Sequence, residues 1–155
     1  MEQLSRFSDK TAATFSIIDT ATIPGESIRY VLIAARHKGK WLFCRHASRQ
    51  SWELPGGKRE RGESARQAAE RELREETGAE RFGLIPVTAY SIIKSDVRHG
   101  MLYMAEVTTL NNALHHEIAE VKLSDSLPSK LRFPDIQPGL FAIAQNFVCL
   151  DNLLL

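Results

Sequence analysis

The sequence predicts a mixed α/β fold of the α+β kind, in which helices pack against a mainly β core. Three observations predict it. Segments rich in β-branched and aromatic residues come first, a charged segment of helical composition follows, and further strand-like segments precede an apolar segment with helical spacing. The chain has 155 residues, so we expect a single domain, residues 1–155, with a core that needs no disulfide or metal to be stable.

Strand-like segments occupy the first third of the chain. Residues 11–20 and 28–36 are rich in β-branched and aromatic side chains, and proline and glycine residues bound them. The sequence HKGK at residues 37–40 is typical of a tight turn, and another apolar segment follows it. We therefore expect residues 29–46 to form a β-hairpin.

A helix is expected from Ser64 to about Thr77. This segment lacks glycine and proline and consists mainly of Ala, Arg, Glu, Gln and Leu, which favour helices. Ser64 stands where an N-cap residue would, and Gly78 follows where a helix would end. The Pro-Gly-Gly sequence at residues 55–57 predicts irregular backbone ahead of this helix.

The rest of the chain predicts three more strands and a closing helix. Apolar residues alternate as they do in strands at residues 82–93, 101–107 and 116–123. Apolar residues recur at helical spacing in residues 139–155. The expected architecture is therefore a mixed β-sheet core flanked by helices.

The composition excludes several classes of protein. Hydrophobic residues make up 43% of the chain and charged residues 25%, as in globular proteins rather than disordered or membrane proteins. The net charge of +1 gives no broad positive field, so we expect no stable nucleic-acid complex, although a local site for a small anion is compatible with it. No segment predicts a signal peptide or a membrane span, so we expect a cytoplasmic protein.

The cysteines and histidines show no metal-binding spacing. Cys44 and Cys149 lie far apart in the sequence, so neither a disulfide framework nor a zinc site is predicted, and we expect both to be buried thiols. The histidines are expected at the surface, because they show no ligand spacing with one another: His46, His99, His115 and His116.

Residues 57–78 hold six glutamates together with six lysines or arginines. At about 100° per residue, Glu72 and Glu76 project from nearly one face of the expected helix, and Glu75 lies about 60° from Glu72. Carboxylates at the edge of a buried helix repel one another and lose hydration unless a cation is present. Hard oxygen ligands at such spacing suit Mg²⁺ or Mn²⁺.

A second interpretation of the same charges is a solvated helix. Glutamates and arginines four residues apart, such as Arg71 and Glu75, commonly pair on exposed helices that bind nothing. Gly56 and Gly57 favour the metal site, because they let the backbone approach a ligand closely and a solvated helix does not require that. The residues alone leave both interpretations open.

The spacing of the charged and glycine residues in this segment resembles the Nudix box. Residues 57–79 fill every charged and glycine position of that signature: Gly57, Glu63, Arg71, Glu72, Glu75, Glu76 and Gly78. The order of the expected strands resembles the Nudix fold, with its catalytic loop and helix at residues 57–79. The resemblance implies hydrolysis of a nucleoside diphosphate linked to another group, by water that attacks phosphorus beside a divalent metal.

The resemblance also implies roles for the residues of the box. Glu72 and Glu76 would bind the metal directly, together with the carbonyl group of Gly57. Glu75 would be a further ligand or would position the attacking water. Mg²⁺ is the implied cofactor, with Mn²⁺ as an alternative, and a nucleotide is the implied substrate.

The supporting and proton-accepting residues follow from the same resemblance. Arg71 would assist catalysis by holding the loop and the helix together, with Glu63 as its partner. Members of the family differ in which carboxylate takes the proton, so Glu75 and Glu120 are both candidates for the base, and Glu120 would also be associated with the metal. Glu117 is a neighbour that could replace Glu120, and either residue could instead be a solvated carboxylate at a strand end.

The flanks of the box resemble the MutT-like branch, which hydrolyses nucleoside triphosphates. WELPGGK at residues 52–58 matches its WEFPGGK closely. Residues 131–147 resemble the segment that closes over a purine, which would place Phe133 near the base and Gln137 at its edge. The branch has asparagine where this chain has Gln137, so the preferred purine stays open. The implied reaction converts a (d)NTP, including an oxidised purine such as 8-oxo-dGTP, to the monophosphate and pyrophosphate.

Residues outside these motifs have two interpretations each. Arg45 precedes the box and could contact a triphosphate through charge-assisted hydrogen bonds, or could be a surface arginine at a strand end. Trp41, Trp52 and Phe133 belong to a residue type that is more often in the core than stacked on a base. None of the three is therefore assigned to a base from its type alone.

Other hydrolases of the family stay open as alternatives. ADP-ribose and dinucleoside polyphosphate hydrolases often carry a proline or a tyrosine downstream of the box. This chain has Lys94 and residues 95–97 at those places. The sequence therefore favours these two substrates less than a nucleoside triphosphate. Pyrophosphohydrolysis at RNA 5′ ends also stays open, because it needs only the terminal phosphates, although the near-neutral charge does not favour it.

Two alternatives lie outside hydrolysis. A non-catalytic Nudix domain that senses a nucleotide is one, although such domains commonly lose carboxylates that this chain keeps. Isomerase chemistry on an isoprenyl diphosphate is the other, and it would need a cysteine in the pocket, for which Cys44 is the candidate. The sequence does not decide between a monomer and a homodimer.

Overall fold

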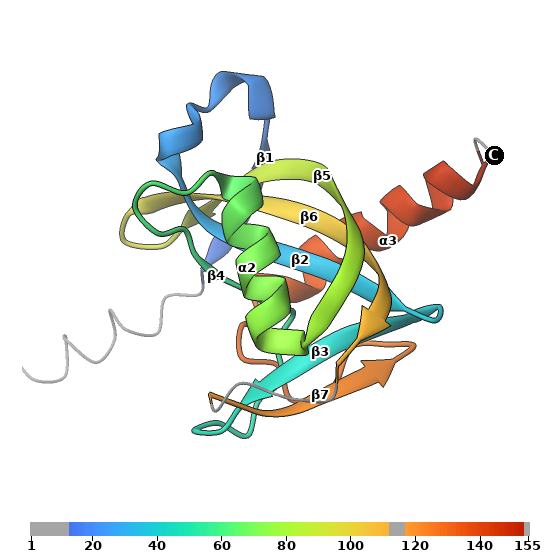
Figure 1. Ribbon diagram of the computed structural model, residues 1–155. Coiled ribbons are helices and arrows are strands. Elements are labelled where there is room, and N and C mark those ends of the chain that lie inside the picture. The colour runs from blue at the N-terminus through green and yellow to red at the C-terminus, as the bar shows by residue number, and fades with distance from the viewer. Residues whose placement is uncertain (1–12, 112–116, 154–155) are drawn as a thin grey trace, which may run out of the picture.

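Two α-helices and a seven-stranded sheet make up the computed structural model, which describes residues 13–111 and 117–153 (Figure 1). The strands are β1 (Thr14–Ile18), β2 (Ile28–His37), β3 (Lys40–His46), β4 (Gly56–Lys58), β5 (Ala79–Ile93), β6 (Val97–Leu110) and β7 (Ile118–Ser124). The helices are α2 (Ala65–Thr77) and α3 (Gln137–Leu153), with short 3-10 helices η1 (Thr20–Thr22) and η2 (Gly25–Ser27). The predicted fold class, a mixed sheet with flanking helices, is confirmed.

The order of the strands places the charged segment beside the centre of the sheet. The order is β1-β5-β6-β2-β3-β7, and β4 pairs with β2 outside this path. β2 and β6 run parallel, whereas the neighbouring pairs on either side are antiparallel. Because β4 pairs with β2 and leads into the segment before α2, the first glycines of the charged segment are held against a central strand.

The hairpin predicted at residues 29–46 is confirmed at its turn and is shorter than expected along its arms. Lys38 and Gly39 have positive φ angles of 52° and 78°, as the central residues of a two-residue hairpin turn do. β2 and β3 pair over the two residues on each side of the turn. Beyond them β3 continues along β7, because β4 occupies that edge of β2.

The helix predicted from Ser64 to Thr77 is confirmed as α2, with both of its caps. The Ser64 side chain accepts a hydrogen bond from the Gln67 backbone N–H, and the Gln67 side chain accepts one from the Ser64 backbone N–H, which completes a capping box. Gly78 ends the helix in the left-handed conformation with φ of 78°, where glycine carries no steric penalty. The buried residues of α2 are Ala68, Ala69, Leu73, Glu76 and Thr77.

Two apolar clusters lie on opposite faces of the sheet, as Figure 1 shows by the positions of α2 and α3. Successive side chains of a strand point to opposite faces. Val31, Ile33 and Ala35 of β2 accordingly pack in the cluster that includes α2. Leu32 and Ala34 pack in the cluster that includes α3. Strand β2 is therefore buried on both sides and gives the site a rigid base.

The closing helix begins at Gln137, two residues before the segment in which the sequence predicts it. Phe141 of α3 packs edge-on against Trp41 with ring centroids 5.0 Å apart, so the predicted core position of Trp41 is confirmed. Among the described residues, neither helix combines the length and the apolar character that a bilayer span requires.

Candidate active site

A cleft of about 970 Å³ opens where three parts of the chain meet. Its walls come from β2 with the segment leading through β4, from the β5–β6 hairpin near its turn, and from the loop before α3. The charged lining residues are four cations and two anions: Lys58, Lys94, Arg98, Arg132, Glu53 and Asp96. A concave site of this size with an excess of positive charge is suited to a phosphorylated small molecule.

Two glycines at the edge of the cleft are required by close packing. A Cβ atom at Gly56 would overlap the backbone carbonyl oxygen of Val31, and one at Gly57 would overlap the Glu72 carboxylate. Gly57 also pairs with Val31 in the sheet. The absence of side chains therefore lets α2 bring its carboxylates directly against the backbone of β4.

Glu76 is the most deeply buried carboxyl group of the charged segment, with a relative exposure of 4%. The Gly56 N–H donates to its Oε1 at 2.7 Å, and His46 Nε2 lies 2.8 Å from its Oε2. Burial raises the pKa of Glu76 to about 9, although the Gly56 hydrogen bond opposes this. The buried charge needs a cation close by if Glu76 is to be ionised at neutral pH.

Glu72 lies one turn earlier on the same face of α2. Its side chain is 14% exposed, and Arg71 donates to its Oε1 at 3.0 Å. Burial raises the pKa of Glu72, and the Arg71 guanidinium lowers it in part. The close approach of Gly57 to this carboxylate brings together the three groups that the box predicts as metal ligands, namely Gly57, Glu72 and Glu76.

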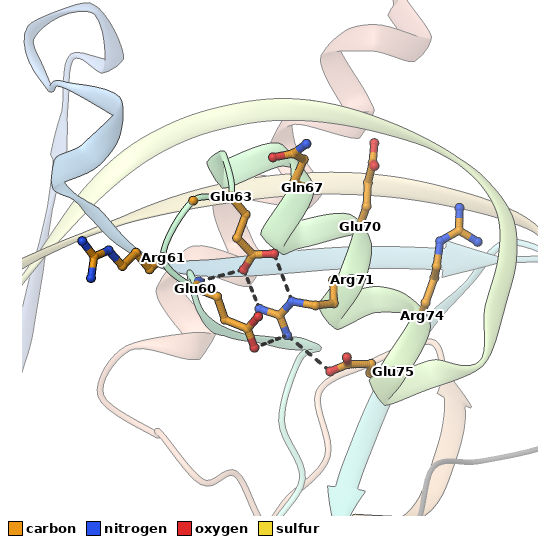
Figure 2. Close-up of a pocket in the computed structure, with 9 residues that line it drawn as sticks. Glu60, Arg61, Glu63, Gln67, Glu70, Arg71, Arg74 and Glu75 are labelled. Carbon is orange, nitrogen blue, oxygen red and sulfur yellow. Dashed lines mark hydrogen bonds and ion pairs between the residues drawn. The ribbon is translucent and has the colours of Figure 1, made fainter.

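Arg71 is the centre of an ion-pair network between the loop and α2, which Figure 2 shows. Its guanidinium donates to both Glu63 oxygens, at 2.7 and 3.1 Å, and to the Lys58 carbonyl oxygen at 3.1 Å. It also lies 3.3 Å from Glu75 and 3.7 Å from Glu60. We call Glu60, Glu63, Arg71 and Glu75 the outer network. The same guanidinium holds the pKa of the Glu63 carboxyl below its usual value. This geometry holds the loop onto the helix.

Glu75 is the most exposed of the three glutamates that the box predicts at the metal. Its side chain is 47% exposed, compared with 14% for Glu72 and 6% for Glu76. Its contact with Arg71 places it at the edge of the outer network (Figure 2). A carboxylate in this position is open to water.

Glu120 and Arg45 form an ion pair with each other. They are opposite one another on β7 and β3, and Arg45 Nη2 donates to Glu120 Oε1 at 3.0 Å. Arg45 also donates to the Arg49 carbonyl oxygen at 2.8 Å. Neither residue is among the described residues that line the cleft. Their predicted roles at the metal and at the triphosphate stay predictions.

The expectation that His46 lies at the surface is wrong. Its side chain is 22% exposed, and Nε2 lies 2.8 Å from Glu76 Oε2 and 3.3 Å from Glu53 Oε1. The end of β3 carries it between α2 and the segment before β4, so it contacts two buried carboxyl groups. Glu53 itself, with 5% relative exposure, was not singled out by the sequence analysis. Strand alternation was an available signal, because it places Cys44 and His46 on one face of β3.

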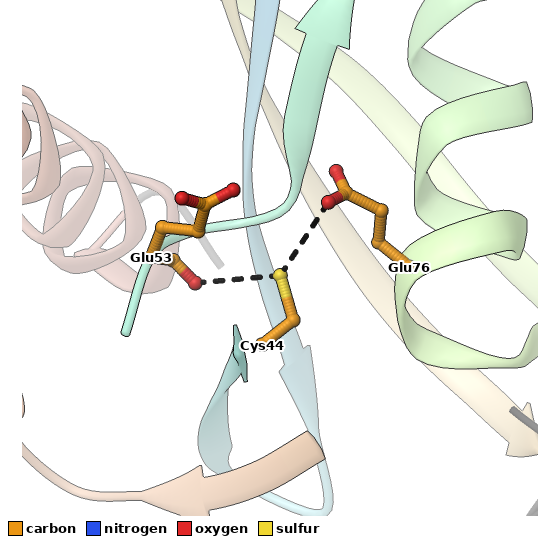
Figure 3. Close-up of side chains that lie close together, drawn as sticks. All are labelled: Cys44, Glu53 and Glu76. Carbon is orange, nitrogen blue, oxygen red and sulfur yellow. Dashed lines mark hydrogen bonds between the residues drawn. The ribbon is translucent and has the colours of Figure 1, made fainter. Parts of the chain in front are cut away.

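Cys44 lies against the same carboxyl groups, as Figure 3 shows. Its S–H donates to Glu76 Oε2 at 3.8 Å and to the Glu53 backbone carbonyl at 3.6 Å. Burial raises the pKa of the thiol, and the neighbouring carboxyl groups of Glu76 and Glu53 raise it further. The expected burial of Cys44 is confirmed, whereas the side chain of Cys149 lies outside the described residues. We call Cys44, His46, Glu53 and Glu76 the inner cluster.

Phe133 and Gln137 both line the cleft. Phe133 is 42% exposed, so of its two interpretations the core position is the one that does not hold. It belongs to the loop before α3, and the Arg132 guanidinium covers its ring at 4.5 Å. Gln137 is 3% exposed, and its Oε1 accepts a hydrogen bond from the Leu54 backbone N–H at 2.8 Å. The amide of Gln137 is therefore fixed in one orientation at the wall of the cleft.

The remaining aromatic and histidine predictions have mixed outcomes. Trp52 is half-buried beneath Lys122 and Arg45, at the edge of the core rather than inside it. His99 is also half-buried, and its Nδ1 lies 2.9 Å from Ser91 Oγ, so its expected surface position is wrong. His115 and His116 lie outside the described residues.

The donor set beside the cleft fits a divalent cation. Glu72 and Glu76 are carboxyl groups whose charged forms burial disfavours, so both are stabilised if a cation lies between them. Gly57 leaves room beside Glu72 that a side chain would fill. Carboxylate and carbonyl oxygens are the ligands that Mg²⁺ and Mn²⁺ prefer.

Comparison with known proteins identifies the family. A family model for the NUDIX domain matches residues 25–135 of this chain. A Bacillus subtilis (strain 168) protein provisionally named 8-oxo-dGTP diphosphatase YtkD is 36% identical over 108 residues, which are 68% of this chain and 68% of that protein. The match includes residues 57–79, whose spacing predicted it.

Solved structures share the fold. The Bacillus subtilis pyrophosphohydrolase BsRppH covers 89% of this chain and 85% of its own, with 29% identity and a TM-score of 0.65. A Nudix hydrolase from Nitrosomonas europaea covers 77% of this chain and 72% of its own, with 25% identity and a TM-score of 0.59. With the family model and the relative above, this chain belongs to the Nudix hydrolase family, whose pyrophosphohydrolases cleave phosphate anhydrides.

Proposed function

We propose that this protein is a Mg²⁺-dependent pyrophosphohydrolase that converts a nucleoside triphosphate to the monophosphate and pyrophosphate, with 8-oxo-dGTP as the first substrate to test. One observation carries the proposal: the buried Glu72 and Glu76 lie against Gly57 and Gly56, and these glycines line a cleft that also carries four cations. The MutT-like sequence of residues 52–58 and the name of the Bacillus subtilis relative support the choice of substrate.

Glu72, Glu76 and the Gly57 carbonyl would hold the Mg²⁺ ion, with Glu75 as a further ligand, and Mn²⁺ would be accepted. When bound, the ion supplies charge neutralisation for the phosphates and lowers the pKa of a bound water. The Gly56 N–H and His46 hold the two oxygens of Glu76. Arg71 keeps the loop and helix together through Glu63, so its part is to position the ligands.

Glu75 is our candidate for the group that takes the proton from the attacking water. Its carboxylate is 47% exposed and lies one turn from Glu72 and beside Glu76 in the sequence of α2. Glu120 is the alternative base, but its ion pair with Arg45 would have to open before it could act. Likewise, Arg45 could contact the triphosphate only after leaving Glu120.

The base of the nucleotide would lie between Phe133 and Gln137. Phe133 is an exposed aromatic ring at the cleft, which offers a surface for stacking. The Oε1 of Gln137 is occupied by the Leu54 N–H, so its NH₂ group is the part left to donate to a base. A donor at this position favours a purine that presents an acceptor, such as the O6 of guanine or of 8-oxoguanine.

A second candidate substrate is a 5′-triphosphorylated RNA. The observation that favours it is the number of cations on the cleft: Lys94 from the β5–β6 turn and Arg98 at the start of β6, which is paired with Asp96, add to Lys58 and Arg132. ADP-ribose, dinucleoside polyphosphates and nucleotide sensing without cleavage are weaker alternatives.

The test is release of pyrophosphate compared with free phosphate, in Mg²⁺, from canonical and 8-oxo (d)NTPs, ADP-ribose, a dinucleoside polyphosphate and 5′-triphosphorylated RNA. We expect pyrophosphate from a purine (d)NTP class, with the 8-oxo form preferred. Pyrophosphate from the RNA alone would select the second candidate. Tight binding of one nucleotide without turnover of any would replace hydrolysis by sensing.

A further inference from the structure

The inner cluster contains donor atoms that a Mg²⁺ site does not use. One ligand atom each from Cys44, Glu53 and Glu76 lie within 4.8 Å of one another, and all three residues are buried. His46 Nε2 lies 2.8 Å from Glu76 Oε2 and 3.3 Å from Glu53 Oε1. One sulfur and two carboxylate oxygens thus form a compact group, and the imidazole nitrogen of His46 lies beside its two carboxylates.

This mixture of donors indicates a different class of metal. Mg²⁺ takes oxygen ligands and retains several waters, whereas thiolate and imidazole ligands are typical of Zn²⁺, Co²⁺ and Cd²⁺. We propose that Cys44, His46, Glu53 and Glu76 form a second metal site, which binds one thiophilic divalent ion of the Zn²⁺ type. Glu72 and Gly57 do not belong to it, and Glu76 is the residue that it shares with the proposed Mg²⁺ site.

Side-chain movements are needed to close the cluster around such an ion. Zn–S and Zn–N bonds of about 2.3 and 2.0 Å imply separations between ligand atoms of about 3.3 to 3.8 Å in a tetrahedral site. His46 Nε2 lies 2.8 and 3.3 Å from the two carboxylates, and the ligand atoms of Cys44, Glu53 and Glu76 lie within 4.8 Å of one another. The group of three has to contract by about an ångström or less, and His46 has to turn toward Cys44 to complete the site.

The surroundings orient the ligands and leave a way in. Arg132 lies 3.3 Å and Arg49 3.9 Å from Glu53 Oε2, so these arginines hold that oxygen and Glu53 Oε1 remains on the side of His46. Glu53 lines the cleft, and the His46 side chain is 22% exposed. An ion can therefore reach the cluster from the cleft or past His46. Binding would displace the Cys44 thiol proton and the proton that His46 and Glu76 share, and both would pass to the solvent.

The shared carboxylate predicts a consequence for the enzyme, and this consequence rests on the proposed function. An ion held by Cys44 and His46 would also be coordinated by Glu76, which is one of the residues that would hold Mg²⁺. Zn²⁺ should therefore inhibit Mg²⁺-dependent turnover, and excess Mg²⁺ should relieve the inhibition incompletely, because the second site has three ligands of its own.

Direct binding of Cd²⁺ tests the site without using turnover. The chain has two cysteines, so Cys149→Ser leaves Cys44 as its single thiol. Cd²⁺ is added to this metal-free variant in excess Mg²⁺, and ultraviolet absorption from sulfur-to-cadmium charge transfer and released protons are recorded. We expect the band to saturate at one equivalent, with protons released in parallel, and Zn²⁺ to remove the band by displacement. Absence of a charge-transfer band from the folded single-thiol protein would overturn the proposal.

Further variants in the same background separate a designed site from a thiol that binds alone. His46→Gln and Glu53→Gln should each weaken Cd²⁺ binding by at least about tenfold, as loss of a ligand does. His99→Gln is the matched control for the histidine and should leave the affinity unchanged. Equal affinity in all of these variants would reduce the site to Cys44 alone and would contradict the four-ligand assignment.

The two proposals fail independently in these experiments. Cadmium binding with this signature but no hydrolysis of any nucleotide would contradict the proposed function and leave the second site standing. Hydrolysis in Mg²⁺ with no charge-transfer band would support the proposed function and contradict the second metal site. Circular dichroism of each variant confirms that it is folded before either result is interpreted.

Discussion

The outer network and the inner cluster hold carboxyl groups from one short segment under opposite electrostatic conditions. In the outer network, Arg71 donates to Glu63 and lowers its pKa. In the inner cluster, the contacts of Glu76 come from a backbone N–H, a histidine and a thiol, and burial raises its pKa to about 9. The comparison teaches that neighbouring glutamates of one motif differ in role because they differ in burial and in partner, rather than in residue type.

Glu76→Gln has the largest expected effect of the changes considered. If it lowered the stability of the fold, as changes in the outer network should, the contrast between the two regions would be wrong. Under the proposed function, turnover should fall by orders of magnitude, because a neutral amide is a poor ligand for the ion. In EDTA its thermal midpoint should equal or exceed that of the native protein, because the change removes a buried acid whose charged form is disfavoured.

Glu70→Gln is the matched control for Glu76→Gln on the same helix. Glu70 pairs with Arg66 at the surface, with 39% of its side chain exposed. Turnover and thermal midpoint should both stay near the native values. Near-normal turnover of Glu76→Gln, measured as pyrophosphate release, would remove Glu76 from the proposed metal site.

Arg71→Ala should be the most destabilising of the changes in the outer network. It removes the donor to Glu63, Glu75 and the Lys58 carbonyl and leaves partly buried carboxylates close together. We expect a loss of about 2 to 3 kcal/mol in the free energy of unfolding, as for hydrogen bonds to charged groups, with little added by the exposed Glu75 pair. Urea denaturation measures it.

Arg71→Lys sharpens the same test, because lysine keeps the charge but cannot donate along both Glu63 oxygens at once. Its loss of stability should be intermediate between those of the native protein and Arg71→Ala. If both variants were as stable as the native protein, the outer network would not be what holds the loop on α2.

The sequence predicted the outer network and most of the fold because both depend on local patterns. Helix α2, its capping residue Ser64 and its end at Gly78 follow from residues that are neighbours along the chain. The Arg71 pairs with Glu63 and Glu75 join positions eight or fewer apart. Spacing within a single segment therefore carries enough information to place them.

The inner cluster was missed because three separate segments build it. Cys44 and His46 come from β3, Glu53 from the segment before β4, and Glu76 from α2, so no spacing in the sequence announces the set. The position of Phe133 could not be taken from its residue type for a related reason. Phe133 is a residue type usual in cores, but its position at a cleft depends on where the loop crosses the sheet.

His46→Gln sharpens the comparison by removing a partner of Glu76 while retaining Glu76 itself. We expect turnover to fall by about 10- to 100-fold, as for partners that orient metal ligands. The fall should come mainly from weaker binding of Mg²⁺, with KM for the nucleotide nearly unchanged, and added Mg²⁺ should restore part of it. His99→Gln, whose ring contacts Ser91 instead, is the control. An equal fall in both variants would assign the effect to general destabilisation.

Glu63→Gln gives the smallest expected effect and tests the sign of the electrostatics in the outer network. The Arg71 guanidinium holds the folded-state pKa of Glu63 below its ordinary value of 4.5. A carboxyl group whose pKa is depressed by folding stabilises the protein above its unfolded pKa, and that contribution is lost as the pH falls through the folded pKa. The native protein should therefore lose stability on acidification below about pH 4.5, and Glu63→Gln should lose less over the same window because it has already lost the pair.

Thermal midpoints measured from neutral pH into this acidic window give the two slopes, with Glu70→Gln as the control that should keep the native slope. A Glu63→Gln slope identical to that of the native protein would show that the carboxyl group is not held by Arg71 in solution. A shallower slope would show that a paired carboxylate supports the fold when ionised. The burial of Glu76 predicts the opposite sign for its own titration, because its charged form is the one that folding disfavours.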